Sequence, residues 1–170
     1  MVILFSGRKS KAEKEIIEIL TKYGGNYISD KFVSENDGNF TIISVYKKCE
    51  IKLKKGIAVF LDDTDRFLNQ NLPIGIIGIC EETNQKALEI FKQNNVAVIS
   101  CGIGAKNTVT LSSFNSDNLL ASLQRTLTDN SGNEIDPCEF KIKLTKEYSP
   151  FSIMSSIAVL LINGILPFEF

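Results

Sequence analysis

The sequence predicts an α/β domain with a mainly parallel, P-loop or Rossmann-like sheet, flanking helices and an antiparallel β-meander extension. Three observations predict this class. Continuous apolar runs at residues 2–5, 57–61, 74–80 and 96–101 are typical of strands buried on both faces. Helical apolar spacing appears between them, at 10–23 and 84–92. Three strand-like runs, 108–114, 119–128 and 134–144, then follow with only polar turns between them, as in an antiparallel meander.

The first helix is predicted from residue 10 to about residue 23. Ile16, Ile19 and Leu20 lie on one face at helical spacing, and Gly24-Gly25 end the helix. The segment Ser10-Lys11-Ala12-Glu13 has the S-x-x-E pattern of a capping box. We therefore expect the Ser10 hydroxyl to accept from the Glu13 N–H, and the Glu13 side chain to reach back to the Ser10 N–H.

The 170 residues are predicted to form a single domain, 1–170. Residues 1–106 form its α/β part, 107–148 its β-meander, and 149–170 a closing helix and tail. Ser149 and Pro150 have the residue types of an N-cap and first helical position, and the helix 150–163 is apolar nearly all round, so we expect it to be buried. In the C-terminal tail, Phe168 and Phe170 are expected to pack onto the domain, with docking of a partner as the alternative.

Composition excludes several classes of function. With 19 Lys and Arg against 20 Asp and Glu, the chain lacks the basic excess of a nucleic-acid binder. Its longest apolar run, 157–162, is far shorter than the about 20 residues that span a membrane. No signal peptide is recognisable, so we expect a cytoplasmic protein without a membrane or nucleic-acid partner. The absence of histidine excludes Ser-His-Asp and Cys-His catalysis.

The four cysteines give no sign of a metal site or a redox motif. They are widely spaced and include no C-x-x-C pair. Two of them, Cys80 and Cys101, end apolar strand-like runs. We therefore interpret the cysteines as reduced residues in or near a core.

The loop after the first strand is the candidate phosphate or anion site, formed by Gly7, Arg8, Lys9, Ser10 and Lys11. A phosphate loop needs glycines that let backbone N–H groups face the phosphates, a lysine, and a Ser or Thr that holds Mg²⁺. Here Ser10 stands at the position of the second glycine and Ala12 at that of the hydroxyl residue. The alternative is a capped helix start, whose basic residues and dipole attract an anion.

A second candidate site follows the middle strand. The acidic turn at 62–65 contains Asp62 and Asp63, which could bind a metal ion. Its spacing is not that of an EF-hand, and acidic residues are also common in solvated turns. Because ligands of open α/β sheets bind at the carboxyl ends of strands, Asp62 and Asp63 could face the Gly7 loop.

The chain resembles a shortened, degenerate central domain of the Mur ligases, ATP-dependent amide-forming enzymes with a G-T-N-G-K-[TS] loop. The stretch "ILFSGRKSKAEKEIIEILTKYG" has the strand, loop and helix of that family. "GIIGICEETNQKALEIFKQNNVAVISCGIG" resembles its strand, acidic turn, helix and strand. "NTVTLSSFNSDNLLASLQRTLTDNSGNEIDPCEFKIKL" resembles its meander, and "SPFSIMSSIAVLLINGILPFEF" its closing helix. The resemblance covers most of the chain and implies ATP and Mg²⁺ as the ligands of the family's loop.

The departures from the family determine the predicted function. The loop lacks a glycine and its Mg²⁺-binding hydroxyl, the family's histidines are absent, and its substrate and carboxy-terminal domains are not expected here. We therefore predict a non-catalytic, Mur-ligase-like binding or interaction module, without catalytic residues. One alternative is an ATP-dependent ligase-like or hydrolase enzyme with a relaxed loop, using Lys11 for phosphates and Asp62 or Asp63 for Mg²⁺. Another is a structural subunit that binds a protein partner or a second copy through helix 150–163 and the tail.

Overall fold

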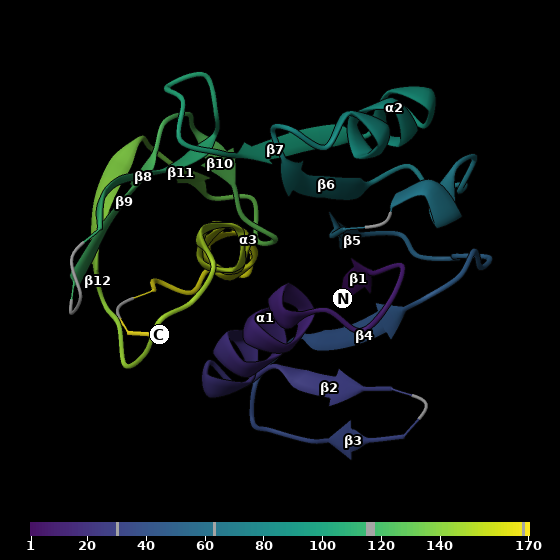
Figure 1. The fold of residues 1–170 in the computed structure, drawn as a ribbon, viewed down its shortest axis with the longest axis horizontal. Helices are drawn as coiled ribbons and strands as arrows, with labels where there is room; N and C mark the ends of the chain where they lie inside the picture. Colours follow the sequence, from purple (N-terminus) through teal and green to yellow (C-terminus); the bar gives the residue numbers. More distant parts are fainter. Residues whose placement is uncertain (30, 63, 115–117, 168) are drawn as a thin grey trace.

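A large, mainly parallel sheet organises the chain (Figure 1). The computed structural model describes residues 1–29, 31–62, 64–114, 118–167 and 169–170. The strands of this sheet are β1 (Val2–Phe5), β2 (Asn26–Ile28), β3 (Val33–Ser34), β4 (Thr41–Val45), β5 (Gly56–Phe60), β6 (Ile76–Glu81), β7 (Ala97–Cys101), β8 (Val109–Phe114), β9 (Asn118–Leu123) and β12 (Cys138–Lys143). Within the described residues their order is β12-β9-β8-β7-β6-β5-β1-β4-β2-β3.

The predicted fold class is confirmed. Strands β4, β1, β5, β6 and β7 are parallel to their neighbours, and β8 joins β7 in parallel at Cys101 and Val109. Strand β2 is parallel to β4 and antiparallel to β3. The predicted meander follows, with β9 antiparallel to both β8 and β12. The meander therefore continues the parallel sheet and does not form a separate sheet.

One predicted strand, 119–128, is divided in two in the structure. Strand β9 ends at Leu123, and the short β10 (Leu127–Thr128) pairs separately with β11 (Glu134–Ile135). Gln124, Arg125 and Thr126, which separate the two strands, are exposed. The last three residues of β9 are all buried, whereas these three polar residues contribute nothing to the core, and the chain leaves the sheet there.

Helices cover both faces of the sheet. One face carries α1 (Lys11–Lys22) and α3 (Pro150–Ile162), and the other carries the 3₁₀ turn η1 (Thr64–Phe67) and α2 (Gln85–Gln93). Figure 1 shows α3 end-on inside the curve that β6, β7, β8, β9 and β12 form, with α1 beside it. The expected burial of the closing helix is confirmed, because residues 152–162 are all buried.

The end of the chain is part of the core. The Phe170 side chain is fully buried, and its ring meets that of Tyr23 edge to face with 6.1 Å between centroids. The Phe170 N–H donates to the carbonyl of Lys143 at 2.9 Å, and its carbonyl accepts from the Thr145 N–H at 2.6 Å. Packing of the tail is therefore confirmed for Phe170, whereas Phe168 lies outside the described residues.

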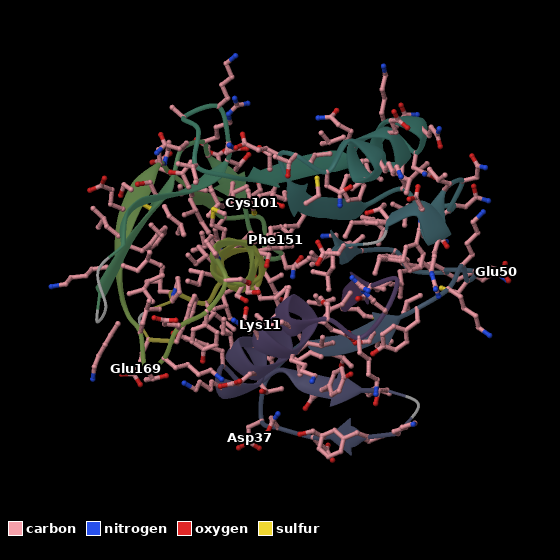
Figure 2. All side chains as sticks on the ribbon, viewed as in Figure 1. Lys11, Asp37, Glu50, Cys101, Phe151 and Glu169 are labelled. Atoms are coloured by element: carbon pink, nitrogen blue, oxygen red, sulfur yellow. The ribbon has the colours of Figure 1, made fainter. Side chains whose placement is uncertain are left out.

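The cysteines are divided between core and surface. Cys80 and Cys101 are buried as expected, whereas Cys49 and Cys138 are exposed. Figure 2 shows Cys101 next to α3. Burial raises the pKa of the Cys80 thiol to about 12, which makes it a poor nucleophile at neutral pH. Within the described part of the chain, no helix has the length and apolar character needed to cross a membrane.

Candidate functional site

The loop from residue 6 to residue 10 lies at the carboxyl edge of the parallel sheet, tied to the ends of two neighbouring strands. The Ser6 N–H donates to the carbonyl of Val45, at the end of β4, at 3.0 Å. The Gly7 N–H donates to the carbonyl of Asp62, after β5, at 3.4 Å. Within the loop, the Ser6 hydroxyl donates to the carbonyl of Arg8. The structure thus brings the backbones of the two predicted sites together.

Ser10 begins α1 as the sequence predicts. Its backbone is extended (φ −115°, ψ 164°), and its hydroxyl oxygen accepts from the Glu13 N–H at 3.1 Å. The predicted reciprocal bond is wrong. Glu13 Oε1 accepts from the Tyr46 hydroxyl at 2.6 Å, and its buried Oε2 has no partner among the described residues. The Glu13 side chain points toward the end of β4 because the Tyr46 hydroxyl is a hydrogen-bond donor there. The Glu13 carboxylate therefore makes no hydrogen bond with the Ser10 N–H.

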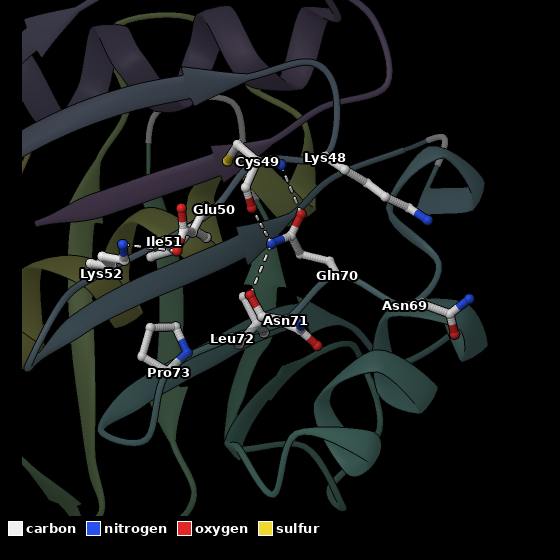
Figure 3. A pocket seen from close by; sticks show the side chains of 10 residues that line it. All are labelled: Lys48, Cys49, Glu50, Ile51, Lys52, Asn69, Gln70, Asn71, Leu72 and Pro73. Atoms are coloured by element: carbon white, nitrogen blue, oxygen red, sulfur yellow. Dashed lines mark hydrogen bonds and ion pairs between the residues drawn. The ribbon is translucent and has the colours of Figure 1, made fainter.

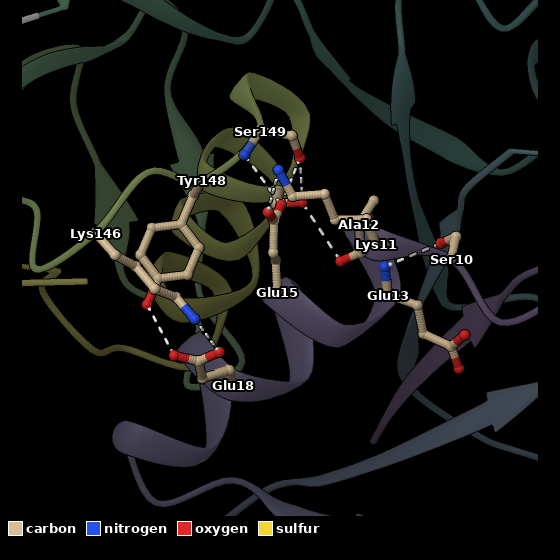
Figure 4. A network of polar contacts seen from close by, with 10 residues as sticks. Ser10, Lys11, Ala12, Glu13, Glu15, Glu18, Lys146, Tyr148 and Ser149 are labelled. Atoms are coloured by element: carbon tan, nitrogen blue, oxygen red, sulfur yellow. Dashed lines mark hydrogen bonds and ion pairs between the residues drawn. The ribbon is translucent and has the colours of Figure 1, made fainter.

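Lys11, the predicted phosphate-binding lysine, lies beside a carboxylate of its own helix (Figure 4). Its ammonium group is 3.5 Å from Glu15 Oε1, one turn along α1, and its side chain is 80% exposed. Glu15 is buried, and its Oε2 accepts from the Ser149 N–H at 3.0 Å and from the Ser149 hydroxyl at 2.7 Å. Lys11 therefore extends a network that joins α1 to the start of α3.

Glu15 supplies the negative charge at the N-terminus of α3. Ser149 is the N-cap as predicted, but its side chain makes no capping bond to its own helix. The Glu15 carboxylate takes that role, in the position where a helix dipole stabilises an anion. Burial raises the pKa of Glu15, but the hydrogen bonds from Ser149 and Ser152 and the charge of Lys11 outweigh it, so this pKa lies below its ordinary value.

A second, more exposed bridge lies one turn further along α1. Glu18 Oε2 is 2.6 Å from the Lys146 ammonium group, and Glu18 Oε1 accepts from the Tyr148 hydroxyl at 3.2 Å (Figure 4). The Lys146 ammonium also lies 5.0 Å from the centre of the Tyr148 ring. The hydrogen bond from Lys146 is the main cause that lowers the pKa of Glu18. Two carboxylates of α1 thus hold the segment that enters α3.

Asp62, one of the two predicted metal residues, lies in a different pocket from the loop side chains. Asp62 is exposed and lines a pocket of about 270 Å³ after β5 and β6, whereas Asp63 lies outside the described residues. The other lining residues are Thr64, Asp65, Glu81, Thr83, Asn84 and Lys86. None of residues 7–11 lines this pocket, and Lys86 already pairs with Asp65. Across the described ranges, no three His, Cys, Asp or Glu side chains are grouped so that they could hold a metal ion.

The loop's basic side chains face different surroundings. Lys9 lines another pocket of about 270 Å³, together with Glu13, Lys14, Ile17, Glu18, Tyr27 and Tyr46. Lys11 lines neither this pocket nor that of Asp62 and pairs with Glu15 near α3. The five predicted residues are consecutive, four in the loop and Lys11 at the start of α1, but the side chains of Lys9 and Lys11 line no common pocket.

A larger cavity of about 760 Å³ lies elsewhere, between segments 48–52 and 69–73 (Figure 3). Gln70 is buried at its base, where its side-chain amide accepts from the Cys49 N–H at 3.2 Å and donates to the Cys49 carbonyl at 2.7 Å. The Gln70 amide thus bonds the N–H and carbonyl of Cys49, the two groups that a neighbouring strand would otherwise bond. The polar Gln70 atoms are therefore used to join two segments of the chain.

Sequence analysis missed Glu15 and Tyr46. Glu15 precedes Ile16 and Ile19 on the buried side of α1, and a carboxylate in such a position needs a partner. The position of Glu15 in the sequence could therefore have identified it as a residue that needs a buried partner. For Tyr46 the sequence offered no such indication, because its partner Glu13 lies 33 residues away.

Comparison with solved structures shows a Mur-ligase-like fold. A crystal structure of MurF from Acinetobacter baumannii superposes with a TM-score of 0.55 at 10% identity, covering 97% of this chain and 43% of that one. The UDP-N-acetylmuramate:L-alanyl-gamma-D-glutamyl-meso-diaminopimelate ligase from Neisseria meningitides gives a TM-score of 0.56 at 9% identity, covering 97% and 61%. This chain thus spans less than two thirds of either structure. No family model and no curated protein sequence matches it.

Proposed function

We propose that this chain is a ligase-type domain of Mur-ligase-like fold that no longer performs ATP-dependent ligation and acts as a binding or interaction module. The observation that carries the proposal is the use of Lys11. In a phosphate loop this lysine contacts the phosphates, whereas here it pairs with Glu15, whose carboxylate already lies at the N-terminus of α3. An incoming phosphate would have to displace a resident anion.

The composition of the loop supports the same proposal. Ala12 has no hydroxyl group for Mg²⁺, and the Asp62 side chain faces a pocket that the loop does not line. These residues do not reproduce the donor set of a Mg²⁺-ATP site. A charge at a helix N-terminus contributes about 0.3–1 kcal/mol, against about 4.1 kcal/mol for millimolar affinity. The dipole of α1 alone is too weak to hold a nucleotide.

The second candidate is an ATP-dependent enzyme with a relaxed loop. The hydrogen bond from Gly7 to the Asp62 carbonyl favours it, because it places the end of β5 next to the loop. The Ser10 N–H, which the Glu13 side chain does not reach, would be one donor for a phosphate oxygen. In this proposal Asp62 would provide a carboxylate for Mg²⁺.

Titration with ATP and ADP by calorimetry, with and without Mg²⁺, tests the two candidates. The proteins compared are the wild type, Lys11→Ala and Lys14→Ala, the last being a control for an exposed lysine on the same helix. We expect no micromolar binding that depends on Lys11, and no ATP hydrolysis. Micromolar, Mg²⁺-dependent binding that Lys11→Ala abolishes and Lys14→Ala retains would establish the enzyme candidate, provided that hydrolysis accompanies it.

A further inference from the structure

Glu13 is a buried carboxylate in a pocket that the proposed function does not use. Its side chain is 2% exposed and lines the pocket of about 270 Å³ that also contains Lys9, Tyr27 and Tyr46. Figure 4 shows Glu13 pointing away from α3, whereas Glu15 points toward it. The pocket is therefore separate from the junction of α1 with α3.

The two oxygens of the Glu13 carboxylate differ in their contacts. Oε1 accepts from the Tyr46 hydroxyl at 2.6 Å, whereas the buried Oε2 accepts from no donor among the described residues. Burial and the bond to Glu13 raise the pKa of the Tyr46 hydroxyl, which therefore keeps its proton and remains a donor at neutral pH. A buried carboxylate oxygen without a donor is costly, because it has lost its bonds to water. Glu13 thus lacks a donor that a ligand can supply.

The other lining residues restrict what such a ligand looks like. Ile17 and the rings of Tyr27 and Tyr46 provide apolar surface for a short carbon chain. Lys9 and Lys14 also line the pocket, and both are exposed. Two ammonium groups repel a ligand that carries only positive charge and attract an anionic group. The complementary ligand therefore has a cationic donor for the carboxylate and an anionic group for the lysines.

We infer that this pocket binds a small primary amine that carries a phosphate or carboxylate group at its other end. The ammonium group of the ligand donates to the Glu13 carboxylate, its carbon chain lies against Ile17 and the two tyrosine rings, and its anionic group lies beside Lys9. Hydrogen bonds between charged groups are about twice as strong as neutral ones, which favours an ammonium group over a hydroxyl group at Glu13. The inference adds a ligand class to the proposed binding role, at a pocket that Lys11 does not line.

Calorimetric titration with four probes tests the ligand class. O-phosphoethanolamine and β-alanine carry both an amine and an anionic group, whereas ethanolamine carries only the amine and inorganic phosphate only the anion. We expect at least one of the two-group probes to bind at millimolar concentration, about tenfold more tightly than either one-group probe. The tighter of the two identifies the anionic group as phosphate or carboxylate. The inference is overturned if neither two-group probe binds, or if ethanolamine or phosphate alone binds as tightly.

Glu13→Gln and Glu18→Gln are a matched pair of variants, since both carboxylates belong to α1 and line this pocket. Glu13→Gln keeps the size of the side chain but removes its charge, and should weaken binding of the two-group probe about tenfold. Both oxygens of Glu18 are already bonded, one to Lys146 and one to Tyr148, so Glu18→Gln should change this affinity less than about twofold. Equal losses in the two variants, or no loss in Glu13→Gln, would contradict the assignment of the amine to Glu13.

Lys9→Ala tests the anionic end of the ligand independently of Glu13. Lys9 is exposed, so the variant should retain the fold, as circular dichroism would report. It should weaken the two-group probe about threefold, because an exposed charge pair contributes little. Unchanged binding of the two-group probe would contradict the contact with Lys9. None of the probes is a nucleotide and Lys11 is intact in every variant, so a failure here is distinguishable from a failure of the proposed function.

Discussion

Replacing Glu15 by alanine should lower the free energy of unfolding by about 3 kcal/mol, because its hydrogen bonds are charge-assisted and buried. The carboxylate accepts from both the N–H and the hydroxyl of Ser149 and has the Lys11 ammonium 3.5 Å away. Without it, the Ser149 N–H loses its partner and the negative charge at the N-terminus of α3 is removed. Urea denaturation of wild type and variant measures the loss.

Glu18→Ala is the matched control for this variant. Glu18 lies one turn away on the same helix and also bridges to the segment before α3, but its side chain is 43% exposed. Exposed ion pairs contribute about 0–1 kcal/mol, so this variant should lose much less stability. Equal losses in the two variants would show that the buried contact with Ser149 is not the main connection between α1 and α3.

The Glu15 contribution should also depend on pH. The pKa of Glu15 is lower in the folded chain than its ordinary value of 4.5, so folding favours the ionised carboxylate. Its stabilising effect is therefore complete above pH 4.5 and declines as the pH falls through the lowered pKa. The difference in unfolding free energy between wild type and Glu15→Ala should shrink when urea denaturation is repeated at about pH 3. A constant difference across this range would contradict the assignment.

Replacing Phe170 by alanine should cost about 3–5 kcal/mol, the range for truncation of a fully buried phenylalanine. The ring is fully buried, packs edge to face on Tyr23 and belongs to the core cluster that includes α3. Its removal would leave a cavity between α1 and the end of β12. Thermal and urea denaturation provide the measurement.

The control is Leu166→Ala in the same tail. Leu166 is 68% exposed, and substitutions at such positions usually change stability by less than about 0.5 kcal/mol. If both alanine variants behaved alike, Phe170 would not be a core residue in solution. A large loss confined to Phe170→Ala would establish that the tail belongs to the folded domain.

The sequence by itself determined the α/β class, the place of the loop and the burial of the closing helix. Each follows from a pattern within a few residues: apolar runs for β1, β5 and β7, helical spacing for α1 and α3, and the N-cap at Ser10. Such patterns are local because strand and helix periodicities, and caps, depend on residues close in the chain.

Only the tertiary structure decided what the polar side chains of α1 contact. Glu13 accepts a hydrogen bond from Tyr46, the residue after β4, and Glu15 accepts one from Ser149, which is 134 residues away. The capping box correctly predicted the local Ser10 bond but not the direction of the Glu13 side chain. A buried carboxylate takes the donors that packing brings to it, and the packing of β4 and α3 against α1 is set by the whole core. Lys11 lies beside this same Glu15. Whether the segment is interpreted as a phosphate loop or as a capped helix start depends on that contact.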